Sequence, residues 1–209
     1  MAPAEPGGSL RVLLVACGGT LDKDYPRGRG GYAFEFGDEP ALRRVLGGVR
    51  SLLPGGGERG GAEFREVEVA GFPKDSLEVT AEDRGRLAAA LRAAVGGSAA
   101  DGEGARVLIT HGTDTLIETA RYLADPEAGI FHAGPRADPT IVLTGARRPE
   151  RFSNSDAPVN LGLAVGALCS LPPGVYIAID LQIFPHDGVV REEDGRFLPT
   201  SAAKLWERR

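Results

Sequence analysis

This 209-residue chain has few cysteines, no long apolar runs and no excess of basic charge. The two cysteines, Cys17 and Cys169, form no CxxC pair, which disfavours a disulfide or a cysteine-based metal site and predicts two reduced thiols in the core. The apolar runs are too short for a membrane span, and the first one lacks the charged flank of a signal peptide. We therefore expect a cytoplasmic protein that does not bind a membrane.

Basic stripes, histidine clusters and phosphate-binding glycine motifs are also missing. The chain has 24 basic and 29 acidic side chains, a net charge of -5, and no run of Lys or Arg, so nucleic acid is not the expected partner. His111, His132 and His186 lack the spacing of metal ligands, and no metal is expected. Neither G-x-G-x-x-G nor GxxxxGK[ST] occurs, so we expect no cofactor and rank a nucleotide-binding Rossmann module last.

The patterns that are present predict one α/β domain. Residues 1–9 are expected to be a loose tail, and residues 10–209 are long enough for a single domain with a real core. Apolar periodicity predicts alternating strands and helices, which favours a doubly wound, mostly parallel sheet of the Rossmann or flavodoxin-like type. No sustained period follows Asp180. The strands are expected at 11–16, 63–69, 106–110, 140–144 and 175–179, and the helices at 40–53, 80–95, 114–123 and from Ser155 or Asp156 to Leu171.

Two apolar runs end in hydroxyl-rich turns, and we take them as the centre of the site. VLLVACGGT (12–20) ends at Thr20, and VLITHGTDTLIET (107–119) contains Thr113 and Asp114. Parallel strands bring their carboxyl ends to one edge of a sheet, where such sheets bind ligands. Thr20 is either a nucleophile, which needs a base nearby, or part of a plain tight turn. Asp114 either caps a helix or holds a cation such as a substrate amino group, with Thr113 positioning a water or a hydroxyl.

A third turn would lie at the same edge because it also follows a strand. In Lys74-Asp75-Ser76, the Ser76 hydroxyl and nearby backbone donors could receive a substrate carboxylate, although a plain loop serine is the commoner case. These turns together describe a small polar pocket.

Five short motifs in this order resemble the bacterial-type L-asparaginase/glutaminase family. The resemblance covers that family's N-terminal domain over roughly residues 10–195, and the pairing of GGT with HGTDT about ninety residues later is its most specific part. The motifs are CGGT at 17–20, KDS at 74–76, HGTDT at 111–115, TGARRP at 144–149 and SDAPVNL at 155–161.

The resemblance implies roles for individual residues. Thr20 matches a nucleophile that forms an acyl-enzyme, Thr113 and Asp114 match the second threonine and the aspartate of the catalytic set, and Ser76 matches a serine that binds the substrate's α-carboxylate. The family's catalytic tyrosine lies on the loop after the nucleophile. Tyr25 and Tyr32 both lie there in this sequence, and Tyr25 is narrowly favoured. The expected neighbours in substrate binding are Gly19, Asp75 and Gly112.

The sequence departs from the family in three places. Cys17 stands where a threonine usually precedes the glycine pair. Arg191 aligns with the family's catalytic lysine, and an arginine cannot readily relay protons as a lysine can. The family's smaller C-terminal domain is expected to be missing, so the chain resembles the short, single-domain asparaginase-like proteins.

These residues favour an amidohydrolase that releases ammonia from a small, asparagine-like amide through a threonine acyl-enzyme. Two alternatives stay open. One is a non-catalytic module that binds amino acids or dicarboxylates and has lost the relay at Arg191. The other is acyl transfer or hydrolysis on a larger amide. The resemblance further implies a homodimer.

Overall fold

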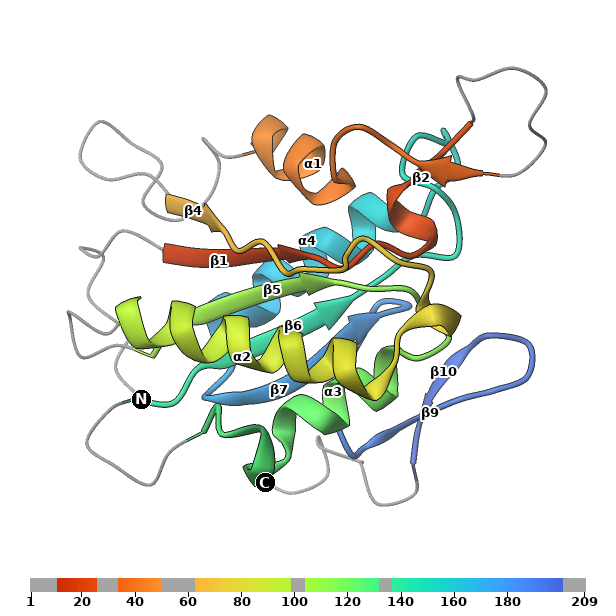
Figure 1. The fold of residues 1–209 in the computed structure, drawn as a ribbon. Coiled ribbons are helices and arrows are strands. Elements are labelled where there is room, and N and C mark those ends of the chain that lie inside the picture. The colour runs from red at the N-terminus through yellow and green to blue at the C-terminus, as the bar shows by residue number, and fades with distance from the viewer. Residues whose placement is uncertain (1–10, 26–33, 50–62, 99–103, 132–136, 201–209) are drawn as a thin grey trace.

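A six-stranded sheet forms the centre of the computed structural model, which describes residues 11–25, 34–49, 63–98, 104–131 and 137–200 (Figure 1). The strand order is β4-β1-β5-β6-β7-β8; the first five strands are parallel and β8 is antiparallel. In chain order the parallel strands run 2-1-3-4-5, the flavodoxin-like arrangement, which confirms the doubly wound α/β class. The strands are β1 (Arg11–Ala16), β4 (Glu63–Glu66), β5 (Arg106–Thr110), β6 (Thr140–Thr144), β7 (Gly174–Ile179) and β8 (Gln182–Pro185).

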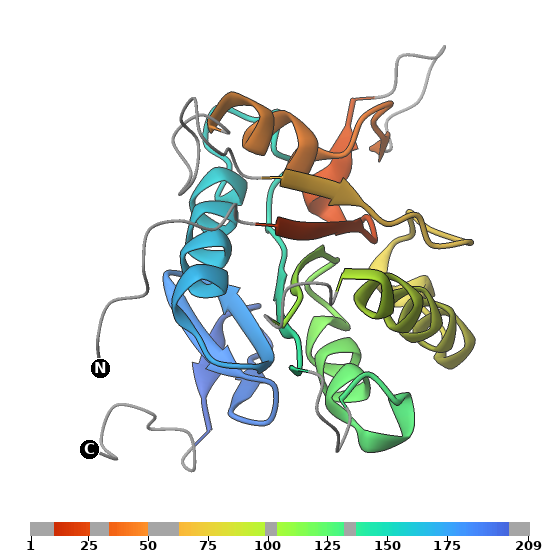
Figure 2. The same cartoon turned by 90° about the vertical axis from the view of Figure 1, so that its left-hand side faces the viewer.

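Helices cover both faces of this sheet, as Figure 2 shows along the strands. α1 (Ala41–Val49) and α4 (Ala157–Ser170) lie on one face, and α2 (Ala81–Ser98) and α3 (Leu116–Ala124) lie on the other. Successive side chains of β1 enter opposite cores: Leu13 packs with α2 and α3, and Leu14 packs with α1 and α4. A strand buried on both faces needs an unbroken apolar run, which explains the pattern of the sequence.

Helix starts follow the local signals in the sequence. At α2 the Thr80 hydroxyl accepts a hydrogen bond from the Asp83 amide (3.2 Å), and the Asp83 carboxylate accepts one from the Thr80 amide (2.9 Å), which is the expected capping box. At α4 the Ser155 hydroxyl accepts from the Ala157 amide (3.0 Å). Asp156 is the N-cap residue but makes no side-chain cap bond there.

Several expected boundaries were close to those of the structure. The strands at 11–16, 106–110 and 140–144 have the predicted bounds, and β7 begins one residue early. β4 is shorter than predicted, since it ends at Glu66 rather than Val69. α3 begins at Leu116 instead of Asp114, because residues 113–115 form a bend before the helix. For the helix predicted over 40–53, residues 50–53 lie outside the described part, as does the tail at 1–9.

Three short strands follow Asp180, where no regular element was predicted. β8 returns antiparallel to β7, and β9 (Val189–Arg191) pairs with β10 (Phe197–Pro199). The turn between β7 and β8 consists of Asp180 (φ 54°) and Leu181 (φ 60°). A two-residue hairpin of this kind usually carries Asn-Gly, and a leucine with positive φ is uncommon, so the usual sequence signal was missing.

The cysteines differ from the expectation in one respect. Cys17 is buried at the end of β1, where burial above all, and then the charge of Asp22, raises the pKa of its thiol. Cys169 is exposed near the end of α4, so the prediction of two core thiols was wrong for this residue. Across the residues that the structure describes, no helix is both long and apolar enough to cross a bilayer.

Candidate active site

The turn after β1 carries Thr20. Cys17 continues the sheet by donating its amide to the Thr110 carbonyl (2.9 Å), and Gly18 and Gly19 then turn the chain with φ of 90° and 81°. These angles are strained for any residue with a side chain, so the glycine pair allows the turn. Thr20 follows as the first residue of a 3₁₀ turn, η1 (Thr20–Asp22).

Three turns meet at this edge of the sheet. A Cβ added to Gly19 would lie 2.3 Å from the Gly112 Cα, and one added to Gly112 would lie 2.5 Å from the Ser76 Cβ. Such distances mean that the backbones are in direct contact. The Thr20 turn, the HGTDT turn and the KDS turn are therefore neighbours, as their positions after β1, β5 and β4 predicted. Whether the hydroxyls of Thr20 and Thr113 face each other stays a prediction.

Hydrogen bonds and one ion pair link the second and third turns to Arg191. The Ser76 hydroxyl, buried with 1% exposure, donates to Asp114 Oδ2 (3.0 Å) and accepts from the Asp114 amide (3.3 Å). Arg191 Nη2 lies 3.1 Å from Asp114 Oδ1. The Thr115 hydroxyl donates to the Ser76 carbonyl (2.7 Å). The structure thus brings Ser76, Asp114 and Arg191 together.

Ion pairs surround the same turns. Lys23 bonds to the Asp75 carboxylate and is the main cause that lowers the pKa of this carboxyl. Lys74 bonds to both oxygens of Asp83 (2.9 and 2.8 Å). Burial acts to raise the pKa of Asp83, but its bonds with Lys74, Thr80 and Arg86 outweigh burial and hold the pKa well below its usual range.

His111 supports the HGTDT turn from inside the protein. It is buried, its Nδ1 lies 2.9 Å from the Gly112 carbonyl oxygen, and its Nε2 lies 3.0 Å from the Thr119 hydroxyl. The Gly112 carbonyl can only accept, so Nδ1 carries the proton and Nε2 accepts from the Thr119 hydroxyl, which itself accepts from Arg84 Nε (3.1 Å). Burial lowers the pKa of His111 to about 4, and Arg84 adds to the effect. These contacts give His111 a structural role beside the HGTDT turn.

The segment after Thr20 is anchored to α1 as well as to the KDS turn. The Asp22 carboxylate accepts from the Ala41 amide (2.6 Å) at the start of α1, and burial raises its pKa to about 6. Tyr25 is 66% exposed, and its ring packs against Phe34 and Phe152, with centroids 5.2 and 5.7 Å away. Tyr32 lies outside the described residues, so the choice between the two tyrosines stays a prediction.

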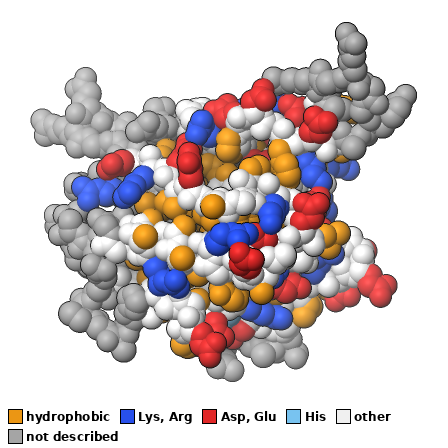
Figure 3. Space-filling view, in the orientation of Figure 1, with side chains coloured by type: hydrophobic (Ala, Val, Ile, Leu, Met, Phe, Trp, Pro, Cys, Tyr) orange, Lys and Arg blue, Asp and Glu red, His pale blue; other side chains and the backbone are white. Residues whose placement is uncertain are grey.

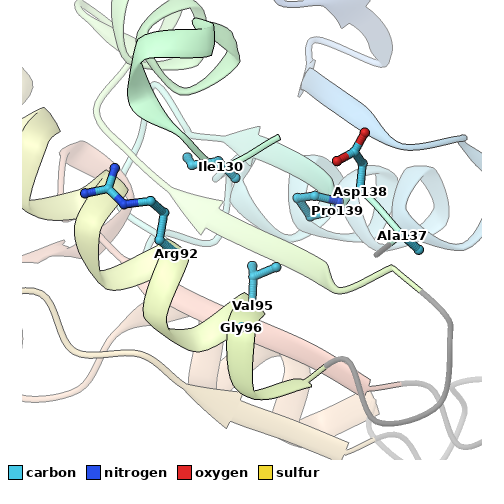
Figure 4. Close-up of a pocket in the computed structure, with 7 residues that line it drawn as sticks. All are labelled: Arg92, Val95, Gly96, Ile130, Ala137, Asp138 and Pro139. Atoms are coloured by element: carbon cyan, nitrogen blue, oxygen red, sulfur yellow. The ribbon is translucent and has the colours of Figure 1, made fainter. Parts of the chain in front are cut away.

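Two of the cavities near the sheet differ in place and size. One of about 690 Å³ lies beside the ends of β1 and β4 and is lined by Asp22, Phe36, Glu68 and Phe72, among others. The other, of about 10 Å³, is lined by Arg92, Val95, Gly96, Ile130, Ala137, Asp138 and Pro139 (Figure 4). Pro139 directly precedes β6, so this small cavity lies at the amino edge of the sheet, opposite the three turns.

Charge on the surface is mixed. On the face drawn in Figure 3, basic and acidic side chains are interspersed among hydrophobic and neutral ones. In the part of the chain that the structure describes, no three His, Cys, Asp or Glu side chains are grouped so that they could hold a metal ion.

Several contacts at the site were not predicted, the Arg191–Asp114 pair among them. The Lys23–Asp75 pair had no local signal, because Lys23 follows the 3₁₀ turn in extended conformation and Asp75 lies 52 positions further along the chain. The bond from Thr115 to Ser76 involves the second threonine of HGTDT, which the motif contains but which had been given no role.

The fold and this site define a doubly wound α/β protein with hydroxyl and carboxylate side chains collected at the carboxyl edge of its sheet. The chain belongs to the family described as asparaginase, N-terminal, whose model matches residues 11–195. The glutaminase-asparaginase of Acinetobacter glutaminasificans is 35% identical over 88 residues, which are 41% of this chain and 24% of that protein.

Solved asparaginases share the fold. L-asparaginase I from Vibrio cholerae superposes with a TM-score of 0.69 at 17% identity, and covers 92% of this chain and 52% of its own. The thermostable L-asparaginase from Thermococcus kodakarensis superposes with a TM-score of 0.65 at 24% identity, over 91% of this chain and 51% of its own. For the probable cytoplasmic L-asparaginase from Campylobacter jejuni the TM-score is 0.64 at 24% identity, over 91% of this chain and 52% of its own. The chain thus spans about half the length of these solved relatives.

Proposed function

We propose that this protein hydrolyses a small, asparagine-like carboxamide through a covalent intermediate on Thr20. The observation that supports the proposal is the backbone contact between Gly19 and Gly112, which directly precede Thr20 and Thr113 in the chain. Membership of the asparaginase family supports the same chemistry.

The reaction would proceed in two balanced steps. The Thr20 oxygen attacks the carboxamide carbon, the carbon–nitrogen bond breaks, and nitrogen leaves as ammonia after taking up the proton from the hydroxyl. Water then adds to the resulting ester, the carbon–oxygen bond to Thr20 breaks, the Thr20 oxygen takes up one proton of the water, and the free acid leaves. Backbone N–H groups of the glycine turn, together with Thr113, would stabilise the negative oxygen that develops in each step.

The other site residues hold the substrate or position these groups. The Ser76 hydroxyl donates its one proton to Asp114 Oδ2 (3.0 Å), so it would receive a substrate carboxylate only after turning away from Asp114. Either Tyr25 or Tyr32 would complete the proton transfer at Thr20. An arginine stays protonated in proteins, so Arg191 cannot accept the proton of the nucleophile.

Measuring ammonia release from L-asparagine, L-glutamine and related small amides tests the proposal. The Thr20→Ala protein should lose all release above the uncatalysed rate, because no hydroxyl remains to form the ester. Thr20→Ser, which keeps a hydroxyl, is the matched control and should retain measurable turnover. Undiminished turnover by Thr20→Ala would disprove the acyl-enzyme.

A binding module is the second candidate, and the Arg191–Asp114 pair favours it because a permanent cation occupies the place of a proton relay. In that case titration calorimetry would detect the binding of a dicarboxylate or an amino acid, whereas the protein would release no ammonia from any amide. Assembly as a homodimer and location in the cytoplasm also stay proposals, and sedimentation and cell fractionation would test them.

A further inference from the structure

The Asp114 carboxylate already has partners on both oxygens. Arg191 Nη2 lies 3.1 Å from Oδ1, and the Ser76 hydroxyl donates to Oδ2 at 3.0 Å. The side chains of Arg191 and Asp114 are 31% and 37% exposed, so the pair borders the site and is reached by solvent. Because an arginine stays protonated, the pair carries no net charge at any pH at which the aspartate is ionised.

Neighbouring carboxylates are paired in the same way. Asp75, which precedes Ser76, bonds to Lys23, and Asp83 bonds to Lys74 and Arg86. A positively charged group of a ligand beside Ser76 would therefore meet carboxylates whose charge a cation already balances. An ammonium placed on Asp114 would also lie close to the Arg191 guanidinium, and two like charges at short range repel each other.

Arg191 is held in place and has donors to spare. It ends β9, pairs with Phe197 of β10, and β9 is tied to α3 by a bond from Arg121 to the Val189 carbonyl (3.2 Å). A guanidinium has five N–H donors in a planar fork that matches a carboxylate. The contact with Asp114 Oδ1 uses one nitrogen, so the fork can receive a second carboxylate.

We propose that Arg191 binds the carboxylate of the substrate and excludes a free α-ammonium group. The preferred substrates are then ω-carboxamide acids without a free amino group, such as succinamate or N-acetyl-L-asparagine, rather than L-asparagine itself. This inference rests on the proposed function, since Thr20 would cleave the carboxamide of these compounds.

The rate test compares succinamate, N-acetyl-L-asparagine and L-asparagine by ammonia release. We expect kcat/KM for the first two to exceed that for L-asparagine by about tenfold or more, the effect of one charged hydrogen bond. Arg191→Met should lower kcat/KM for succinamate by about tenfold and reduce the preference. Arg191→Lys, which keeps the charge but not the fork, should lie between them.

A matched control removes an ion pair elsewhere. Arg43 on α1 pairs with Glu66 on β4 and is about half exposed, so Arg43→Met should leave all three rates unchanged. A higher kcat/KM for L-asparagine than for succinamate in the wild-type protein would overturn the inference, as would an unchanged preference in Arg191→Met.

A binding test separates this inference from the proposed function. Succinate and L-aspartate, the corresponding products, are titrated into the wild-type, Thr20→Ala and Arg191→Met proteins by calorimetry. We expect succinate to bind about tenfold tighter than L-aspartate to the first two, and to bind weakly to Arg191→Met. Tighter binding of L-aspartate, or binding of neither, would overturn the inference. Ammonia release by Thr20→Ala would instead disprove the covalent mechanism alone.

Discussion

Gly112→Ala is the substitution that tests the contact between the three turns most directly. The new Cβ would lie 2.5 Å from the Ser76 Cβ and 2.6 Å from its Oγ, and Ser76 is only 1% exposed, so it has no open space into which to move. The KDS turn must then shift away from β5. This shift breaks the bonds of Ser76 with Asp114 and Thr115.

The size of the effect follows from these contacts. Overpacking costs about 1–3 kcal/mol, and three lost hydrogen bonds cost about 1 kcal/mol each when their groups can reach water. We expect a loss of about 4–6 kcal/mol in the free energy of unfolding, which lowers Tm by roughly 15 °C for a protein of this length. Hydrolysis should fall as well, because Ser76 leaves its position beside Asp114.

Gly162→Ala is the matched control for this experiment. Gly162 lies inside α4, and no atom stands within 4 Å of an added Cβ. Alanine favours a helix over glycine by about 0.5–1 kcal/mol, so this variant should be slightly more stable than the wild type. Thermal unfolding, followed by circular dichroism, measures both variants. A Gly112→Ala protein that melts within about 2 °C of the wild type would refute the close contact of the three turns.

Two further predictions concern His111 and Thr80. Because the pKa of His111 is about 4 in the folded protein and 6.5 is its ordinary value, the unfolded chain binds this proton first as pH falls. The contribution of the neutral imidazole to stability is complete above pH 6.5 and is lost towards pH 4. Between pH 7 and pH 5, the free energy of unfolding measured in urea should therefore fall by about 2 kcal/mol more for the wild type than for His111→Asn. An imidazole that titrates near 6.5 in an NMR titration would contradict this. Thr80→Ala should cost about 1–2 kcal/mol by removing the α2 cap, whereas Thr80→Ser should be close to the wild type; equal stability of both variants in urea unfolding would argue against the capping box.

Local signals account for the elements that the sequence predicted well. The runs at 11–16, 106–110 and 140–144 are apolar at their centres because both faces of each strand are buried, and this pattern does not depend on which helix covers them. The capping box of α2 likewise involves residues only three positions apart. The hairpin after β7 could not be predicted from local signals, because Asp180 and Leu181, rather than glycine or asparagine, occupy its two positions with positive φ.

The sequence by itself determined the five parallel strands, that they form a doubly wound sheet, and that Thr20, Ser76 and Thr113 follow strand ends at one edge. Tertiary structure alone decided how closely the turns pack at Gly19 and Gly112, and which cation meets which carboxylate. The Arg191–Asp114 pair depends on the β9–β10 hairpin, which lies far along the chain from β5. Periodicity is a property of neighbouring residues, whereas a side-chain pair between distant segments exists only after packing has set their distance and orientation.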